Sequence, residues 1–279
     1  MPKKTVVVFL ILLTAIGIYF VKDLNSLPTI TYFPIDYGTS FTNATTHLQV
    51  NPNDSTKNYI LEWDVSSTTE VPMYLRQDVS LLYANGELKG MRSKWRENKD
   101  TIEYTERLKD NQDARWDAIT FHYGEIHLDN TINSVQKITA DHLFVYRQNS
   151  IFKLTDSDIK SKQQKLVELE TKKKLLSHWQ SLLTYFKIDI QNYESIPLTD
   201  LYTIQDKPFL NMDKENSDRV IGQLWEGLYK NYIIPNIESK DSLKSFVPLI
   251  LFDKKGDHLL VVYEINGRKE KLIQKLQLD

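Results

Sequence analysis

The first 22 residues constrain this chain more than any other segment. Thr5 to Val21 is a run of 17 residues without a charged side chain, with two lysines before it and Lys22 after it. As a helix this run is ~25 Å long at about 1.5 Å per residue, which approaches the ~30 Å hydrocarbon core of a bilayer. The sequence therefore predicts that residues 1–22 are a cytoplasmic stub followed by a transmembrane anchor at residues 5–21.

The charges on either side of the run predict its orientation. Lys3, Lys4 and the terminal amine precede it, whereas Lys22 and Asp23 cancel each other after it. Because positive charge gathers on the cytoplasmic side of membrane helices, we expect the amino terminus in the cytoplasm and the rest of the chain outside. The expected localisation is the cell membrane, with a single membrane pass.

The same run has two alternative interpretations. A cleavable signal peptide has an apolar region of ~7–15 residues and small residues at its cleavage site, but this run is longer and ends in the bulky residues 18–21. A buried core helix is the second alternative. A lipoprotein is excluded because the chain has no cysteine to acylate.

Composition narrows the class of protein further. The formal charge of −2 provides no basic field for binding phosphates, so we expect no nucleic-acid partner. The 257 residues that follow residue 22 (279 minus 22) are enough to bury a core without disulfides.

The exported part begins with a predicted linker and continues as a β-rich region. Residues 23–56 are rich in proline and polar side chains, which is typical of a linker that enters a fold. From residue 57 to 154 apolar and polar residues alternate with period two, which predicts an antiparallel sheet. The expected strands are Tyr59–Val65, Val79–Tyr83, Leu88–Trp95, Ile102–Leu108, Trp116–Leu128 and His142–Arg147.

The dipeptide Asn85-Gly86 predicts the connection between two of these strands. A tight type I′ turn needs positive φ at both central residues, and Asn and Gly adopt it at little cost. We therefore expect Val79–Tyr83 and Leu88–Trp95 to form a hairpin.

Residues 155–235 are predicted to be helical. A capping pattern at Thr155–Asp158 begins a helix at about 157–187, whose carboxyl half alone carries an apolar stripe. That stripe comprises Leu175, Leu176, Trp179, Leu182, Leu183 and Phe186. A second helix at about 217–232 has Ile221, Leu224, Trp225, Leu228 and Tyr232 on one face, and Pro235 is expected to end it.

Residues 236–279 return to strands. Three expected strands, Phe246–Phe252, His258–Ile265 and Arg268–Leu276, form a meander with a second tight turn at Asn266-Gly267. Three short strands bury too little surface alone, so they should pack on the helices or extend the earlier sheet. The predicted fold class is α+β, with residues 57–279 as one extracytoplasmic domain.

His122, Glu125 and His127 are the candidate metal ligands. On a regular strand Glu125 and His127 share a face and His122 lies on the other, so a bulge at Gly124 would be needed to bring all three together. His142 or Asp129 could then complete a tetrahedral zinc site. The alternative is two strand histidines and an edge carboxylate without metal.

Other chemical motifs are incomplete. Ser157 and Lys160 have the S-x-x-K spacing of serine acyl-enzymes, but the accompanying elements are missing. The oxygen-rich turns at residues 110–113 and 129–133 lack a full calcium ligand set. We therefore predict no cofactor and no catalytic residues, and a non-enzymatic role is favoured.

Two surface hypotheses concern aromatic and basic residues. Fifteen Tyr and five Trp could form a sugar-stacking platform, although the spacing of most of them indicates core packing. Lys172, Lys173 and Lys174 are expected to be a solvated helix face, with contact to an anionic polymer or to lipid headgroups as the alternative.

The leading functional hypothesis follows from the anchor and the incomplete motifs. We expect a binding or assembly protein that contacts the membrane through residues 5–21 and an envelope protein through its outer domain, where it modulates a complex or sensor. One alternative is a wall-associated or metal-dependent hydrolase that uses His122, Glu125 and His127. A second alternative is a carbohydrate-binding module.

Overall fold

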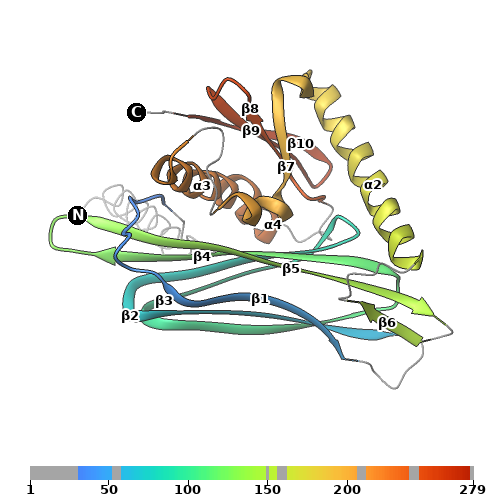
Figure 1. Ribbon diagram of the computed structural model, residues 1–279, viewed down its shortest axis with the longest axis horizontal. Helices are drawn as coiled ribbons and strands as arrows, with labels where there is room; N and C mark the ends of the chain where they lie inside the picture. Colours follow the sequence, from blue (N-terminus) through green and yellow to red (C-terminus); the bar gives the residue numbers. More distant parts are fainter. Residues whose placement is uncertain are drawn as a thin grey trace, which may run out of the picture.

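A computed structural model describes residues 31–51, 58–148, 151–155, 162–205, 212–238 and 245–276. The predicted anchor at residues 5–21 and the Ser157–Lys160 motif lie outside these ranges. Within the described residues no helix combines the length and apolarity needed to cross a membrane. The chain is a mixed α+β protein with two antiparallel sheets, and helices and the smaller sheet cover one face of the larger sheet (Figure 1).

One very long hairpin forms the centre of the larger sheet. It consists of β2 (Tyr59–Ala84) and β3 (Glu87–Asp110), which contain 26 and 24 residues. The predicted turn is confirmed, because Asn85 and Gly86 have φ of 49° and 80°. Two strands predicted separately, Tyr59–Val65 and Val79–Tyr83, are parts of the single strand β2.

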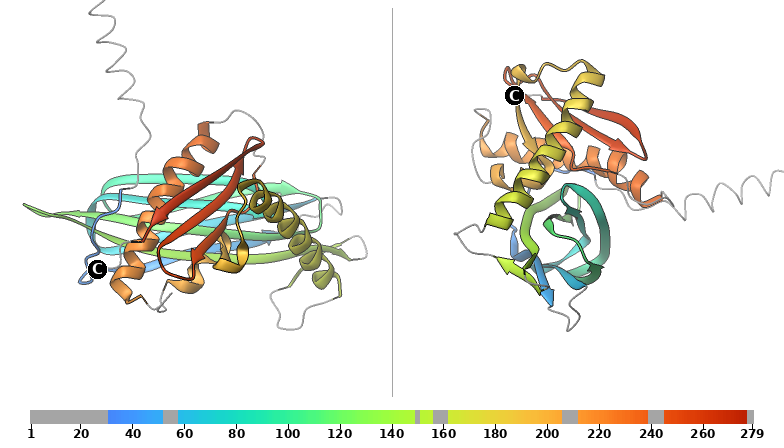
Figure 2. Two further views of the ribbon diagram at one scale, coloured as in Figure 1. Left: turned by 90° about the horizontal axis from the view of Figure 1, so that it is seen from above. Right: turned by 90° about the vertical axis from the view of Figure 1, so that its right-hand side faces the viewer.

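This hairpin bends back on itself. Its register shifts between Thr68 and Met73, and on the opposite strand Asn98 has a positive φ of 49°. The two ends of β2 therefore approach one another, as the hydrogen bond of 3.0 Å from Trp116 Nε1 to the Tyr59 hydroxyl shows. Figure 2 shows the result, a sheet curled into a roll.

Different strands flank the two halves of β2. β1 (Phe41–Asn51) pairs with its first half, and β4 (Ala114–His127) pairs with its second half. β5 (Ile132–Gln148) then pairs with β4, and β6 (Ile151–Thr155) with β5. The strand order is β1-β2-β4-β5-β6, with β3 beside β2.

β1 corrects the predicted linker at residues 23–56, because residues 41–51 of that segment form a strand. Its buried face consists of Thr46, Leu48 and Val50, and the residues between them are exposed. The polar threonines at the start of the strand hid this period-two pattern in the sequence.

Three α-helices and a second sheet make up the rest of the described residues. The helices are α2 (Lys162–Phe186), α3 (Lys214–Leu228) and α4 (Ile234–Glu238), with short 3-10 turns at Ile190–Asn192 and Leu198–Ile204. The predicted carboxyl-terminal meander is confirmed as β8 (Leu249–Asp253), β9 (His258–Ile265) and β10 (Arg268–Lys275). These strands form a separate sheet with β7 (Tyr193–Pro197) instead of extending the first sheet.

Two apolar cores result from this arrangement. Inside the roll, Trp63, Trp116 and their neighbours form one core. The outer face of β2 and β4 forms the other with α3 and the second sheet, where the rings of Phe121 and Trp225 stack at 5.0 Å. The apolar face predicted for the second helix is buried here as expected.

Two details of the predicted helices are wrong. Leu176, placed in the apolar stripe of the first helix, is 51% exposed, because it lies on the side of α2 that faces away from the sheets. Pro235 does not end the second helix. The chain widens into a π-helical turn (Tyr229–Ile233), in which the Ile234 N–H bonds to the Tyr229 carbonyl, and α4 continues through the proline to Glu238.

Gly86 and Gly267 offer a matched test of the packing at the main hairpin turn. Both have positive φ, of 80° and 77°, but a Cβ at Gly86 would lie 2.5 Å from a methyl carbon of Leu175, whereas a Cβ at Gly267 meets nothing within 4 Å. We expect Gly267→Ala to lower the free energy of unfolding by about 1 kcal/mol through backbone strain alone. Gly86→Ala should lower it by at least about 1 kcal/mol more. Urea denaturation followed by tryptophan fluorescence checks this, and equal losses would contradict the packing of α2 on this turn.

Candidate functional site

The structure separates the three residues predicted as metal ligands. β4 keeps a continuous register through Gly124, so His122 points into the roll while Glu125 and His127 lie on its outer face. Glu125 and His127 contact each other at 3.0 Å. The described part of the chain contains no group of three or more His, Asp or Glu side chains placed to hold a metal ion.

Gly124 has a packing role instead of forming the bulge. A Cβ at this position would lie 2.3 Å from the Met73 sulfur, so the glycine allows the bent part of β2 to approach β4. The other two proposed ligands do not complete the set either. His142 lies opposite Asp117, five positions along β4 from His122, and Asp129 lies in the exposed turn after β4.

His122 belongs to a buried ion cluster inside the roll. Arg76, Asp78 and His122 are each fully buried. His122 Nδ1 lies 3.2 Å from Asp78 Oδ2, and Ser67 donates to the same oxygen at 2.5 Å. The Arg76 guanidinium donates to Ser67 and to Thr69 at 3.1 Å. Burial lowers the pKa of Arg76, and the Asp78 carboxylate opposes that shift.

A chain of hydroxyl groups extends from this cluster across the interior. His122 Nε2 lies 2.8 Å from the Thr139 hydroxyl, which in turn lies 2.6 Å from that of Thr46. Thr46 donates to Thr120, and Thr120 donates to Ser80, each at 2.6 Å. Since Thr46 is in β1 and Thr139 is in β5, this series of hydroxyl groups connects two strands that are not paired.

The line along which β1 and β5 meet without pairing is the seam of the roll. Asp141 closes one end, because its carboxylate accepts the backbone N–H of Leu48 in β1 at 2.7 Å and that of His142 in β5 at 2.8 Å. At the other end Ser134 of β5 exchanges backbone hydrogen bonds with Pro34 and Asp36. Between the Thr46–Thr139 bond and Ser134, a groove separates the two edges.

A groove of about 490 Å³ occupies this part of the seam, and we call it the seam groove. Its lining combines residues 35–37 and 39–44, the β5 residues 135–137, and Gln205, Lys214 and Asp218. The Tyr37 hydroxyl donates to Asp218 at 3.2 Å, and Lys214 pairs with the same carboxylate at 2.9 Å. Burial and the Asp218 carboxylate raise the pKa of Tyr37. Tyr37 nevertheless leaves 55% of its surface open to solvent.

Phe41 lies between the seam groove and the ion cluster. It lines the groove, and its ring centre is 5.9 Å from that of His122 and 4.7 Å from the guanidinium carbon of Arg76. Arg76 Nε and Asp78 Oδ1 have no hydrogen-bond partner within the described residues. The floor of the groove is therefore an aromatic ring backed by charged groups with unused hydrogen-bonding capacity.

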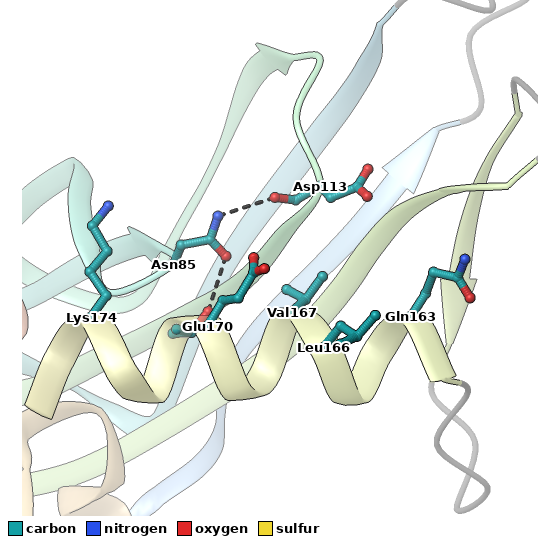
Figure 3. Close-up of a pocket in the computed structure, with 8 residues that line it drawn as sticks. Asn85, Asp113, Gln163, Leu166, Val167, Glu170 and Lys174 are labelled. Carbon is teal, nitrogen blue, oxygen red and sulfur yellow. Dashed lines mark hydrogen bonds between the residues drawn. The ribbon is translucent and has the colours of Figure 1, made fainter.

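A second, smaller groove lies beside α2, as Figure 3 shows. It has a volume of about 350 Å³ and runs between the helix and the turn at Asn85. Asn85 donates to the Asp113 carbonyl at 3.1 Å and accepts from Thr171 at 3.2 Å. The polar groups of the Asn85 side chain therefore fix the helix on the roll.

Sequence reasoning identified His122 but not the residues around it. Arg76 and Asp78 are two residues apart in β2, so a charged pair on one face of an otherwise buried strand was the available signal. The groove residues come from separate segments, and no local spacing connects them.

Comparisons with known proteins give little further information. No family model and no curated protein sequence matches the chain. Among solved structures, the chain is similar to the CARDB domain of a Pyrococcus furiosus protein, determined in complex with di-metal ions. The match has 12% identity and a TM-score of 0.23 and covers 41% of this chain and 97% of that one, and this low similarity carries no argument about function.

The ion cluster predicts an unequal response to two charge-removing substitutions. Asp78→Asn leaves the buried Arg76 guanidinium without its counter-ion, and we expect the free energy of unfolding to fall by about 3–5 kcal/mol. Glu106→Gln is the control. It removes an ion pair with Arg92 in which the Arg92 side chain is 50% exposed and the Glu106 side chain is 35% exposed. Exposed pairs contribute about 0–1 kcal/mol. Chemical denaturation of both variants checks this, and a loss below about 1 kcal/mol for Asp78→Asn would contradict the described cluster.

Proposed function

We propose that this chain is a single-pass, membrane-anchored extracytoplasmic binding or assembly protein that takes its partner in the seam groove. The apolar run at residues 5–21 supports the anchor. The seam groove is the observation that carries the binding role. Its volume of about 490 Å³ lies within the range of about 300–1,000 Å³ typical of ligand sites.

The groove offers several kinds of contact to a partner. Tyr37 and Phe41 provide aromatic faces, and Lys214 provides an exposed ammonium group, which the buried Asp218 carboxylate holds in place. Strand β1 also presents backbone groups. The Leu48 N–H points away from β2 toward Asp141, so the N–H group of the groove residue Ala44, four residues earlier, points to the same edge. These contacts suit a polar partner segment in an extended conformation.

The ion cluster supports binding more than catalysis. Arg76, Asp78 and His122 contact one another and nearby hydroxyls behind Phe41, so they stabilise the wall of the groove. The hydrolase hypothesis required His122 to join Glu125 and His127, and these residues lie on opposite faces of β4.

A carbohydrate is the second candidate ligand, and Tyr37 favours it. Four of the five tryptophans, Trp63, Trp116, Trp179 and Trp225, are buried, so they provide no sugar-stacking platform. Tyr37, however, is 55% exposed, and its hydroxyl is fixed by a hydrogen bond to Asp218, so its ring can stack on a sugar ring.

Site-specific photo-crosslinking in intact cells tests the proposed binding site. A benzophenone amino acid at Tyr37 should form a covalent adduct with a partner. The same group at Tyr185, which is 62% exposed on α2, should not. The mass of the adduct distinguishes a protein from a glycan. No adduct at Tyr37, or the same adducts from both positions, would overturn the seam groove as the binding site.

A further inference from the structure

We propose that the outward face of α2 between Lys162 and Leu176 docks on an anionic lipid surface. The proposal rests on the membrane anchor of the proposed function, and it assigns a second contact with the same membrane. Leu166, Leu169 and Leu176 are 49%, 63% and 51% exposed, which is unusual for three leucines on one helix. An apolar stripe of this kind indicates a contact surface.

Three lysines share that side of the helix. At about 100° per residue, Lys162, Lys165 and Lys173 fall among the three leucines. The buried residues Gln164 and Thr171 point in the opposite direction, toward the roll. The Leu/Lys face is thus formed by Lys162, Lys165, Leu166, Leu169, Lys173 and Leu176.

The Leu/Lys face carries three lysines and no acidic side chain of its own. None of its three lysines forms an ion pair within the described part of the chain. The two acidic residues of this part of α2 lie at the margins of the face: Glu168 lies near Arg115, and Glu170 lines the groove of Figure 3, which Leu166 also lines. A partner for this face must therefore be apolar at its centre and negative around it.

An anionic bilayer surface has this combination. Leucines on an amphipathic helix enter the boundary between headgroups and acyl chains, and lysines extend their stems so that the ammonium groups reach lipid phosphates. A second copy of the same face would be repelled by the lysines, so self-association through it is disfavoured.

The position of α2 is compatible with the proposed anchor. The first described residue, Thr31, accepts a hydrogen bond of 2.7 Å from the Tyr123 hydroxyl. Ala114, at the other end of β4, lies near the turn on which α2 packs. At about 3.3 Å per residue, the strand from Ala114 to Tyr123 is ~30 Å long, so α2 lies about that far from Thr31. In Figure 1 these two regions lie toward opposite ends of the roll. Residues 22–30 can span ~30 Å when extended, so both regions reach the bilayer if the roll lies along its surface.

A single-cysteine label tests this contact, since the chain has no natural cysteine. The full-length Leu169→Cys variant is labelled with a polarity-sensitive fluorophore and reconstituted into vesicles of phosphatidylcholine alone or with added phosphatidylglycerol. We expect blue-shifted emission only with phosphatidylglycerol, and high salt should reverse the shift. The control is Glu194→Cys, an exposed position on β7.

A charge variant separates lipid contact from other effects. Adding Lys162→Gln, Lys165→Gln and Lys173→Gln to the labelled chain should abolish the blue shift, and unchanged tryptophan fluorescence would show that the fold is intact. Equal emission in the two kinds of vesicle, or equal shifts at positions 169 and 194, would overturn the proposal.

Vesicle flotation after an alkaline wash reports the anchor independently. A chain that floats but shows no shift overturns the docking of α2 and leaves the anchor in place. A chain that does not float overturns the anchor and, with it, the proposed docking.

Discussion

The architecture depends on one bent hairpin that closes over a buried charged pair. β2 and β3 fold back near Thr68–Met73, and this brings Arg76 and Asp78 into the interior. Two such charges are costly to bury alone, so the bend is stable only while Ser67, Thr69 and His122 surround them. The interior of the roll is consequently polar near the bend, whereas Trp63 and Trp116 pack in its apolar part.

The seam follows from the same bend. Because β2 carries β1 on one half and β4 on the other, β1 arrives beside β5 without pairing with it. Thr46, Thr139 and Asp141 connect the two edges through side chains, and the strands separate where these connections stop. An incompletely closed roll thus exposes strand edges at a defined place, and exposed edges are common sites of partner binding.

Local signals in the sequence predicted much of the fold. Asn85-Gly86 and Asn266-Gly267 specified both tight turns, and the spacing of apolar residues specified α3 and the carboxyl half of α2. Strand β1 was missed because threonine takes the place of an apolar residue on its buried face. The seam groove was beyond local reasoning, since residues such as Tyr37, Lys137 and Asp218 meet only through the tertiary fold. His122 was singled out, but its partners are Asp78 and Thr139, and Glu125 and His127 lie on the opposite face of β4.

The proposed partner binding and the proposed lipid docking both require the folded domain to lie outside the cytoplasm, and one labelling measurement tests this most directly. Lys255 lies in the exposed turn between β8 and β9, so a Lys255→Cys variant carries one accessible thiol in a chain without other cysteines. A membrane-impermeant maleimide should label this variant in intact spheroplasts as fully as after lysis. Labelling that appears only after lysis would place the seam groove in the cytoplasm and contradict the account.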